Sequence, residues 1–380
     1  MAIDLKFDVI VVGAGPGGAF TAYNLAKNDY QVLLLEKESL PRYKSCGGAV
    51  SLKVKEIIGD IDLNNIIEDE VTKVVFTHNF QQPIDIDFYK PFTYMAMRDK
   101  FDNFLVEKAK KAGVKVIDGS QVIDLVKYDN QYRVKTEQEI FTTKYIVGAD
   151  GVKSLVAKKL GLMNDLEYGV AYEKELKVSE ERLVMQRGII HLDYGMIADG
   201  YGWIFPKGHH LSVGVGTFKD GISLKEKLDV YIKEEGLSDS QAIKAKGHLL
   251  PIGGDKRQLN TEFGLVVGDA AGLVDPLSGE GIFYALKSGL LASQVLDSVL
   301  SERGSLNEYT ELVNQQILTE LKKAKLVSKI FFPFTKVAHK LFSKKEWILK
   351  QLIKIIYGEE SYDDLYSSFK AELPFLRFRS

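Results

Sequence analysis

The chain opens with Phe7-Asp8-Val9-Ile10-Val11-Val12-Gly13-Ala14-Gly15-Pro16-Gly17-Gly18, an apolar strand that runs directly into a glycine turn and a helix start. Gly13 allows the tight turn, Gly15 lets the backbone approach a pyrophosphate, and Gly18 lets the helix pack close to the strand. The helix that starts at Pro16 then points its unpaired amide groups at the phosphate charge. The stretch predicts a Rossmann-like dinucleotide site that includes Gly13, Gly15, Pro16 and Gly18.

An acidic residue follows the next apolar run at the position that such a site requires. Glu36 comes directly after Val32-Leu33-Leu34-Leu35, and it lies 18 residues beyond Gly18. A carboxylate at the end of this strand accepts hydrogen bonds from ribose hydroxyls and repels a 2′-phosphate. We therefore assign Glu36 and its neighbour Lys37 to the cofactor site.

Composition narrows the class of protein. The 380 residues are 45% hydrophobic, which is enough for two globular domains. The net charge of −2 argues against a nucleic-acid-binding protein, whose domain would be strongly basic. The six histidines and the one cysteine show no metal-ligand spacing, so we expect no metal.

The same features bear on location. A lone cysteine, Cys46, forms no internal disulfide, and the N-terminus lacks the basic and apolar regions of a signal peptide. No apolar run approaches the roughly 18 to 20 residues that cross a bilayer. We expect a cytoplasmic protein whose membrane contact, if it has one, is peripheral at the inner face.

Strand and helix patterns alternate in a way that predicts a discontinuous nucleotide domain. Antiparallel strand patterns fill residues 61–97 and 161–257. Buried strand patterns recur between them and end in Ala149-Asp150-Gly151 and Gly268-Asp269. The predicted fold is α/β (α+β), with a three-layer Rossmann-like domain and an inserted antiparallel substrate domain. Its predicted boundaries are 1–60, 98–160 and 258–300 for the nucleotide domain, 61–97 and 161–257 for the substrate domain, and 301–380 for a helical region.

The helical region carries an unusual charge pattern. Residues 321–355 contain ten lysines and one acidic residue, with aromatic and aliphatic residues between them. A basic, apolar helical surface suits an anionic membrane face. The alternative is a solvated helical cap whose apolar stripe packs on the rest of the protein.

The three strand ends, together with Arg98 at the start of a helix, resemble the FAD-containing fold of the para-hydroxybenzoate hydroxylase group over roughly residues 5 to 300. The resemblance implies that Glu36 holds the adenosine ribose. It places Arg98 and Val122 along the adenine and pyrophosphate side, and Asp269 at the ribityl or pyrophosphate region. It also implies that Gly281 and Ile282 lie near the pyrimidine edge of the flavin, where helix amides stabilise negative charge. The resemblance also implies that Asp150, Cys46 and Gly47 contact the cofactor.

Two motifs narrow the resemblance. Pro41-Arg42-Tyr43-Lys44-Ser45-Cys46-Gly47-Gly48 and Tyr201-Gly202-Trp203-Ile204-Phe205-Pro206-Lys207-Gly208 resemble the cysteine-glycine-glycine and YxWxFPxG signatures of the geranylgeranyl reductase family. The resemblance implies reduction of isolated C=C bonds in a polyprenyl lipid, quinone or prenyl pyrophosphate. The predicted substrate contacts are Gly48, Tyr201, Trp203, Phe205, Pro206 and Gly208.

Each of these residues has a simpler alternative. Cys46 is assigned to the catalytic site, where a thiol that is mostly protonated at neutral pH donates or positions a proton, and the alternative is inert packing. Trp203 and Phe205 fit an ordinary core as well as a pocket wall. Arg98 is either a cofactor ligand or a surface cation, and Asp150 either a cofactor ligand or a turn cap.

Two other functions share this scaffold. The first is a flavin monooxygenase that hydroxylates or epoxidises an apolar substrate, and the second is a non-catalytic prenyl-binding or escort protein. The electron donor is also open, because Gly214-Val215-Gly216 lacks the third glycine and the helix of a nicotinamide site. Electrons come either from NAD(P)H or from a reduced ferredoxin-like protein.

Overall fold

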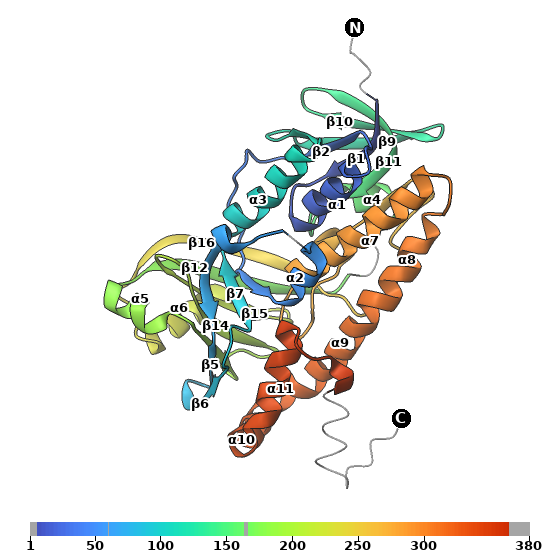
Figure 1. Cartoon of the computed structure of the whole chain (residues 1–380). Helices are drawn as coiled ribbons and strands as arrows, with labels where there is room; N and C mark the ends of the chain where they lie inside the picture. Colours follow the sequence, from blue (N-terminus) through green and yellow to red (C-terminus); the bar gives the residue numbers. More distant parts are fainter. Residues whose placement is uncertain (1–5, 60, 163–165, 365–380) are drawn as a thin grey trace.

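The computed structural model describes residues 6–59, 61–162 and 166–364. Its first sheet holds the N-terminal strand at its centre (Figure 1). The strands in spatial order are β8 (Lys115–Ile117), β2 (Val32–Leu35), β1 (Lys6–Val12), β11 (Ile140–Gly148), β10 (Gln131–Thr136) and β9 (Val122–Tyr128), with β17 (Gly264–Val266) beside β11. The pairs within β8-β2-β1-β11-β17 are parallel, and β9, β10 and β11 are antiparallel.

The register of the parallel strands brings their carboxyl ends to one edge. Val12 is opposite both Leu35 and Gly148, and Gly148 is opposite Val266. The residues that follow these strands therefore begin at the same level. This alignment places the glycine turn, Glu36 and Ala149 side by side, at the edge where open parallel sheets bind nucleotides.

Helices α1 (Pro16–Ala26), α3 (Arg98–Lys111) and α7 (Ile282–Leu300) lie beside this sheet, and α1 packs against both α3 and α7. The close approach of α1 and α7 depends on Gly289, because a Cβ there would lie 2.6 Å from the carbonyl oxygen of Gly17. The Thr21 hydroxyl also donates to the Gly289 carbonyl at 3.1 Å. The short α4 (Leu155–Lys159) and η2 (Gly268–Ala271) complete this half of the molecule.

The second sheet also has seven strands and is mostly antiparallel. Its order is β16 (Gln241–Pro251), β12 (Tyr168–Lys177), β15 (Leu211–Thr217), β14 (Gly200–Pro206), β13 (Ile189–Tyr194), β5 (Lys73–His78) and β6 (Gln81–Asp87). Only the β13–β5 pair is parallel. Helices α5 (Glu180–Gln186) and α6 (Leu224–Glu234) lie at one side of this sheet (Figure 1). The mixed α/β class predicted from the sequence is confirmed.

A third, three-stranded sheet was not predicted. It consists of β3 (Ala49–Ser51), β7 (Thr93–Ala96) and β4 (Ile67–Val71), and α2 (Lys53–Ile58) and η1 (Asn64–Ile66) lie within this stretch of the chain. Strands of three to five residues are too short to show alternation in a sequence. The sheet pairs strands from both sides of the predicted boundary at residue 60, so the domain boundaries themselves stay a prediction.

The C-terminal helices are α8 (Asn307–Val313), η3 (Asn314–Leu318), α9 (Thr319–Phe331), η4 (Phe332–Phe334), α10 (Thr335–Lys344) and α11 (Glu346–Tyr357). Helix α8 packs beside α7 in the first half of the molecule, whereas the later helices cover the second sheet on the side away from α5 and α6 (Figure 1). Phe332, Phe342 and Ile353 are buried in one apolar cluster with Phe76 and Leu192 of the sheet. In the described part of the chain, none of the helices is both long and apolar enough to span a bilayer.

Candidate active site

The glycines of the turn have two different roles. Two of them pack against neighbouring backbone, and one has open space beside it. A Cβ on Gly13 would collide with the backbone of Ala149, and one on Gly18 with the carbonyl oxygen of Gly13. A Cβ on Gly15 would meet only the Nη2 of Arg42, at 3.8 Å. The N-terminus of α1 has no side-chain cap and no acidic residue in its first turn. The open space at Gly15 and the unsatisfied amides fit a pyrophosphate.

Glu36 faces this turn. Its carboxylate accepts hydrogen bonds from the amides of Ala14 at 2.8 Å and Glu38 at 3.1 Å, and it is 4% exposed. Its backbone carbonyl accepts from the amide of Ser120 at 2.8 Å, so the start of β9, with Val122, is near. Lys37 is exposed to solvent. The roles of Glu36, Lys37 and Val122 in holding a ribose and adenine remain predictions.

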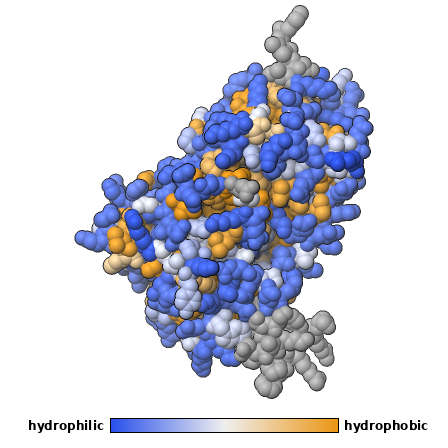
Figure 2. Space-filling view, in the orientation of Figure 1, coloured by the Kyte–Doolittle hydropathy of each residue, from blue (hydrophilic) through white to orange (hydrophobic). Residues whose placement is uncertain are grey.

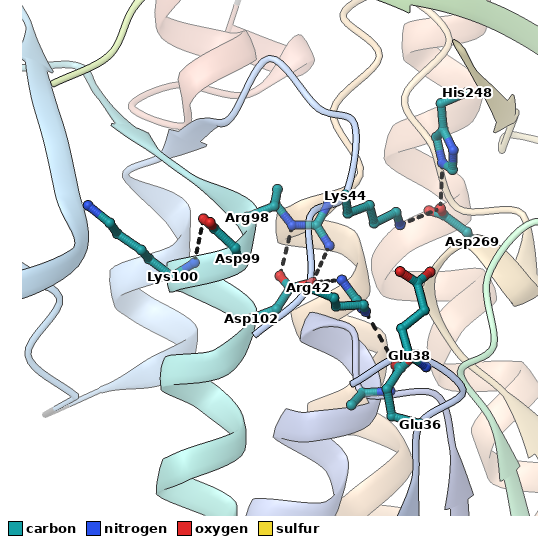
Figure 3. Close-up of polar contacts among 11 residues, drawn as sticks. Glu36, Glu38, Arg42, Lys44, Arg98, Asp99, Lys100, Asp102, His248 and Asp269 are labelled. Carbon is teal, nitrogen blue, oxygen red and sulfur yellow. Dashed lines mark hydrogen bonds and ion pairs between the residues drawn. The ribbon is translucent and has the colours of Figure 1, made fainter. Parts of the chain in front are cut away.

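Arg98 is buried, so it is not a surface cation. Its Nε and Nη2 each donate to Asp102 at 2.8 Å, and the Nη1 of Arg42 reaches the same carboxylate at 3.0 Å. Figure 3 shows both guanidinium groups converging on Asp102, with Glu36 beyond Arg42. Since Arg42 also lies 3.4 Å from Glu36, two cations and two carboxylates meet beside the glycine turn. Sequence reasoning did not identify Arg42 or Asp102 as part of the site.

Asp269 forms a second polar centre, which lies beyond Lys44 and away from Asp102 (Figure 3). Its Oδ2 lies 3.2 Å from the Nζ of Lys44 and 3.4 Å from the Nε2 of His248. Burial alone would raise the pKa of Asp269, but these two groups outweigh it and hold the pKa well below its usual range. Asp269 is thus an ionised acceptor at the edge of the first sheet.

The side chain of Asp150 is already engaged. It accepts hydrogen bonds from the hydroxyl of Ser154 and from the amide of Val156 at 3.2 Å, and so caps α4. This geometry matches the turn-cap interpretation of Asp150. Its contact with a cofactor stays a prediction.

One continuous cavity joins the nucleotide edge to the second sheet. From the nucleotide side it is lined by Pro16, Arg98, Asp269, Gly281 and Ile282. The loop residues Cys46, Gly47 and Gly48 form its middle, and Tyr201, Trp203 and Phe205 of β14 form a wall beyond them. Alternation along β14 explains the wall, because every second side chain of a strand points to the same face. The two sequence motifs therefore meet in one site.

Pro206 and Gly208, which we also assigned to the substrate wall, do not line this cavity. Pro206 is out of phase with Phe205 on β14, so it belongs to the other face of the strand. The amide of Gly208 donates to Glu68 at 3.1 Å beyond the end of the strand. These two residues shape the turn rather than the wall.

The contact between the two motifs is close. A Cβ on Gly47 would lie 2.9 Å from the ring of Phe205 and 3.3 Å from the Nε1 of Trp203. The Nζ of Lys207, a residue that is 1% exposed, donates to the carbonyl oxygens of Gly47 at 2.5 Å and Ala96 at 3.2 Å. The cysteine-glycine-glycine loop is thereby fixed against the aromatic wall.

The Gly214-Val215-Gly216 stretch has a structural explanation. Gly214 is opposite Trp203 on β15, and a Cβ on it would collide with the indole ring. The glycine thus makes room for the indole within the sheet. Tyr201 lies two residues before Trp203 on β14. Its hydroxyl donates to the carbonyl oxygen of Ser278, which connects β14 to the loop that precedes α7.

The C-terminal helices supply much of the apolar cavity wall, which the sequence did not predict. Val327 and Phe331 of α9, Phe342 of α10, and Leu349 and Ile353 of α11 all line the cavity. Their apolar stripe faces inward, as the helical-cap interpretation expects. Only the packing of the tail onto the second sheet reveals this role.

Several polar residues of the cavity were also missed: Lys44, Glu173, His248 and Glu280. The sequence does hold a signal for Glu173, because alternation along the strand places it on the same face as Ala171 and Glu175. Glu280 lies beside Gly281 in the loop before α7. Burial raises the pKa of Glu280 to about 7, and Lys53 opposes this shift. No group of three or more potential metal ligands occurs in residues 6–59, 61–162 and 166–364.

Comparison with known proteins identifies relatives over most of the chain. The FAD binding domain family matches residues 6–191. The chain is 30% identical to the geranylgeranyl diphosphate reductase of Nicotiana tabacum, over 85% of this chain and 74% of that protein. It is also 30% identical to the digeranylgeranylglycerophospholipid reductase of Methanocaldococcus jannaschii, over 85% of this chain and 87% of the relative.

Solved structures share the fold. A geranylgeranyl bacteriochlorophyll reductase-like protein of Thermoplasma acidophilum superposes with a TM-score of 0.82 at 24% identity, covering 98% of this chain and 97% of that one. A flavin-dependent brominase gives a TM-score of 0.74 at 17% identity, covering 97% and 99%. The fold is therefore common to flavoproteins with different reactions.

We predict that Gly15→Val removes flavin without unfolding the protein. The Cβ at this position has open space on the protein side, so the added methyl groups occupy the volume that a pyrophosphate needs. Purified G15V should retain less than about a tenth of the wild-type FAD, as measured by absorbance. The thermal unfolding temperature of flavin-free G15V should match that of the flavin-free wild type. Normal FAD content in G15V would contradict this placement of the pyrophosphate.

Glu280 predicts a pH-dependent stability. Because its folded pKa of about 7 lies above the 4.5 of an ordinary glutamate side chain, the folded state binds a proton that the unfolded state has lost in this pH interval. The free energy of unfolding therefore falls as pH rises from about 4.5 to 7, by at most about 3 kcal/mol. Denaturation of flavin-free Glu280→Gln should show a gain over the wild type that is larger at pH 8 than at pH 5. An equal difference at both pH values would refute the raised pKa.

Proposed function

Because this chain belongs to the geranylgeranyl reductase family of FAD-dependent oxidoreductases, we propose that it reduces isolated C=C bonds of a polyprenyl chain. The observation that carries the proposal is the single cavity that runs from the nucleotide edge to an aromatic and aliphatic interior. When bound, FAD supplies the hydride from its reduced ring. The residues of this chain supply the binding site, the orientation and the proton.

The polar end of the cavity suits the cofactor. Arg98 and Lys44 are cations near the glycine turn, and Asp269 is an ionised acceptor for hydroxyl groups. The loop of residues 275–281 leads into α7, whose N-terminal amides suit the negative charge of a reduced flavin. Gly281 has no side chain between these amides and the cavity.

The apolar end suits an extended hydrocarbon. Tyr194, Tyr201 and Trp203 lie in sequence along it, with ring centroids 5.4 and 6.0 Å apart. Phe331 and Phe342 face them from the C-terminal helices. Such a wall holds an alkene by contact and excludes water, which favours hydride transfer to a poor acceptor. Cys46 and Gly47 lie between this wall and the polar end.

The test is anaerobic turnover. Enzyme whose flavin has been reduced should be reoxidised by a geranylgeranyl lipid, and mass spectrometry should find product two hydrogens heavier per reduced bond. Trp203→Ala should slow this reoxidation at least about tenfold, since an aromatic side chain of the wall is lost. The electron donor is compared by reducing the flavin with NADPH, NADH or reduced ferredoxin.

The outcomes separate the alternatives. A product one oxygen atom heavier, formed with oxygen consumption, would identify a monooxygenase. Tight lipid binding without any product would identify an escort protein. Either result overturns prenyl reduction.

We also propose that the C-terminal helices rest on an anionic membrane. Leu326, Ile330, Phe334 and Val337 are 61–64% exposed and follow one another at helical spacing along α9, η4 and α10. The exposed lysines flanking this stripe are 322, 329, 336, 340 and 344, and none of them has an ion-pair partner among the described residues. Figure 2 shows a mostly hydrophilic face whose hydrophobic residues gather near its middle, at the height of α2 in Figure 1 and above the position of α10.

The two faces of α9 connect this surface to the cavity. Leu326 and Ile330 point to solvent, whereas Val327 and Phe331 line the cavity from the same helix. A lipid substrate held in a bilayer under this surface has a short path to the aromatic wall. Apolar contact and attraction between lysines and lipid phosphates would combine in such binding.

Flotation with vesicles tests this surface. The wild type should float with vesicles that contain phosphatidylglycerol and not with neutral vesicles. Ile330→Asp/Phe334→Asp/Val337→Asp should bind at least about 100-fold more weakly, because three apolar side chains no longer enter the interface. Val184→Asp/Met185→Asp is the matched control, since these residues are 58% and 62% exposed elsewhere. Equal flotation of all three proteins would leave the helices a structural cap.

A further inference from the structure

A row of acidic side chains leads away from the cavity along β12. Glu173 and Glu175 alternate on the same face of the strand, and they are 2% and 3% exposed. Glu173 lines the cavity, and Glu175 lies one step farther from it. Burying two carboxyl groups this close together is costly unless they share protons and hydrogen bonds.

Tyr43 bridges the two acids. Its hydroxyl lies 3.0 Å from the Oε1 of Glu173 and 3.4 Å from the Oε1 of Glu175. The single hydroxyl hydrogen is donated to one carboxyl group at a time, so the bridge has two alternative arrangements. The same Glu173 oxygen accepts the amide of Cys46 at 2.8 Å, which places it directly behind the cysteine-glycine-glycine loop.

The outer end of the row reaches solvent at His210. The Nε2 of His210 lies 3.0 Å from the Oε2 of Glu175, and its side chain is 15% exposed. His210 belongs to the turn between β14 and β15, which also carries Lys207. Hydrogen-bond distances thus join Tyr43 to both acids, and the outermost contact, between Glu175 and His210, is an ion-pair distance at which neither atom makes a hydrogen bond in this structure.

We infer that His210, Glu175, Tyr43 and Glu173 form a proton-supply route, with Glu173 as the group that protonates the double bond. The inference rests on the proposed function, because that reaction consumes one proton and one hydride per bond. The hydride from the reduced flavin bonds to one alkene carbon, and the Glu173 carboxyl proton bonds to the other. The Tyr43 proton then passes to Glu173, the Glu175 proton to Tyr43, and the His210 proton to Glu175, while His210 regains a proton from water.

The surroundings of Glu173 favour its protonated form. Burial and the nearby Glu175 raise the pKa of Glu173, against the hydrogen bonds from Ser45, Cys46 and Tyr43. Lys207 is the buried cation of this region, and burial lowers its pKa. The ammonium group of Lys244 lies 4.2 Å from the ring centroid of Tyr43, on the outer side. A general acid of this kind contributes about 10² to 10⁴ in rate.

The first test follows reoxidation of the reduced enzyme by a geranylgeranyl lipid in H₂O and in D₂O. Glu173→Gln should slow reoxidation at least about 100-fold with an unchanged KM, and Glu173→Asp should restore part of the rate. Glu235→Gln is the control, because Glu235 also has a raised pKa but does not line the cavity. E235Q should reoxidise at the wild-type rate.

Two further measurements do not depend on the rate of the E173Q enzyme. Infrared spectra of the wild type at neutral pH should contain a protonated-carboxyl band that E173Q lacks. The His210→Ala enzyme should be reoxidised by the lipid more slowly than the wild type. Added imidazole should restore its reoxidation rate, since the His210 site lies near the surface.

The outcomes distinguish the two proposals. If the lipid does not reoxidise the wild type, the proposed function fails. If the lipid reoxidises E173Q as fast as the wild type, the proposed function stands and the proton route is refuted. The same conclusion follows if reoxidation is slowed in Glu280→Gln and not in E173Q. Absence of the carboxyl band, or an H210A enzyme that imidazole does not rescue, also refutes the route.

Discussion

The hydrogen bond from Lys207 to the carbonyl oxygen of Gly47 holds together two parts of the site that are far apart in the sequence. The amine is almost fully buried, so its carbonyl partners are what make its burial tolerable. The same contact holds Gly47 beside Phe205 and Trp203, so close that a side chain at this position would collide with the Phe205 ring. This attachment, together with the hydrogen bonds from Tyr201 to Ser278 and from Cys46 to Glu173, keeps the polar and apolar ends of the cavity next to each other.

The register of the first sheet provides the second constraint. Val12, Leu35, Gly148 and Val266 end at one level, so the turn, the acid and the loops that follow them meet without any special long-range contact. Arg42 and Arg98 then converge on Asp102 beside this edge. Because Arg42 also pairs with Glu36, the two cations and two carboxylates balance one another, and their guanidinium groups are fixed beside the edge where the cofactor would lie.

The sequence revealed those parts of the site that local patterns encode. The strand–glycine–helix unit, Glu36 and the two motifs of residues 41–48 and 201–208 follow from short-range spacing. The contribution of Phe331, Phe342 and Ile353 could not be read in this way, because an inward stripe and an exposed stripe have the same period on a helix. Pro206 and Gly208 were grouped with the wall because a motif does not state which of its residues share a face. Lys44, Glu173 and His248 come together only through the packing of β12 and β16 against the loop of residues 41–48.

Helix α9 carries apolar side chains on two of its faces, since Phe331 faces the cavity and Ile330 faces solvent. A prenyl tail that moved from a lipid phase past this helix would exchange one oily environment for another. The hydrophobic effect then contributes almost nothing to its uptake, because no apolar surface leaves water. Discrimination among tails would depend on dispersion and shape within the aromatic chamber, so isomers that partition alike need not react alike.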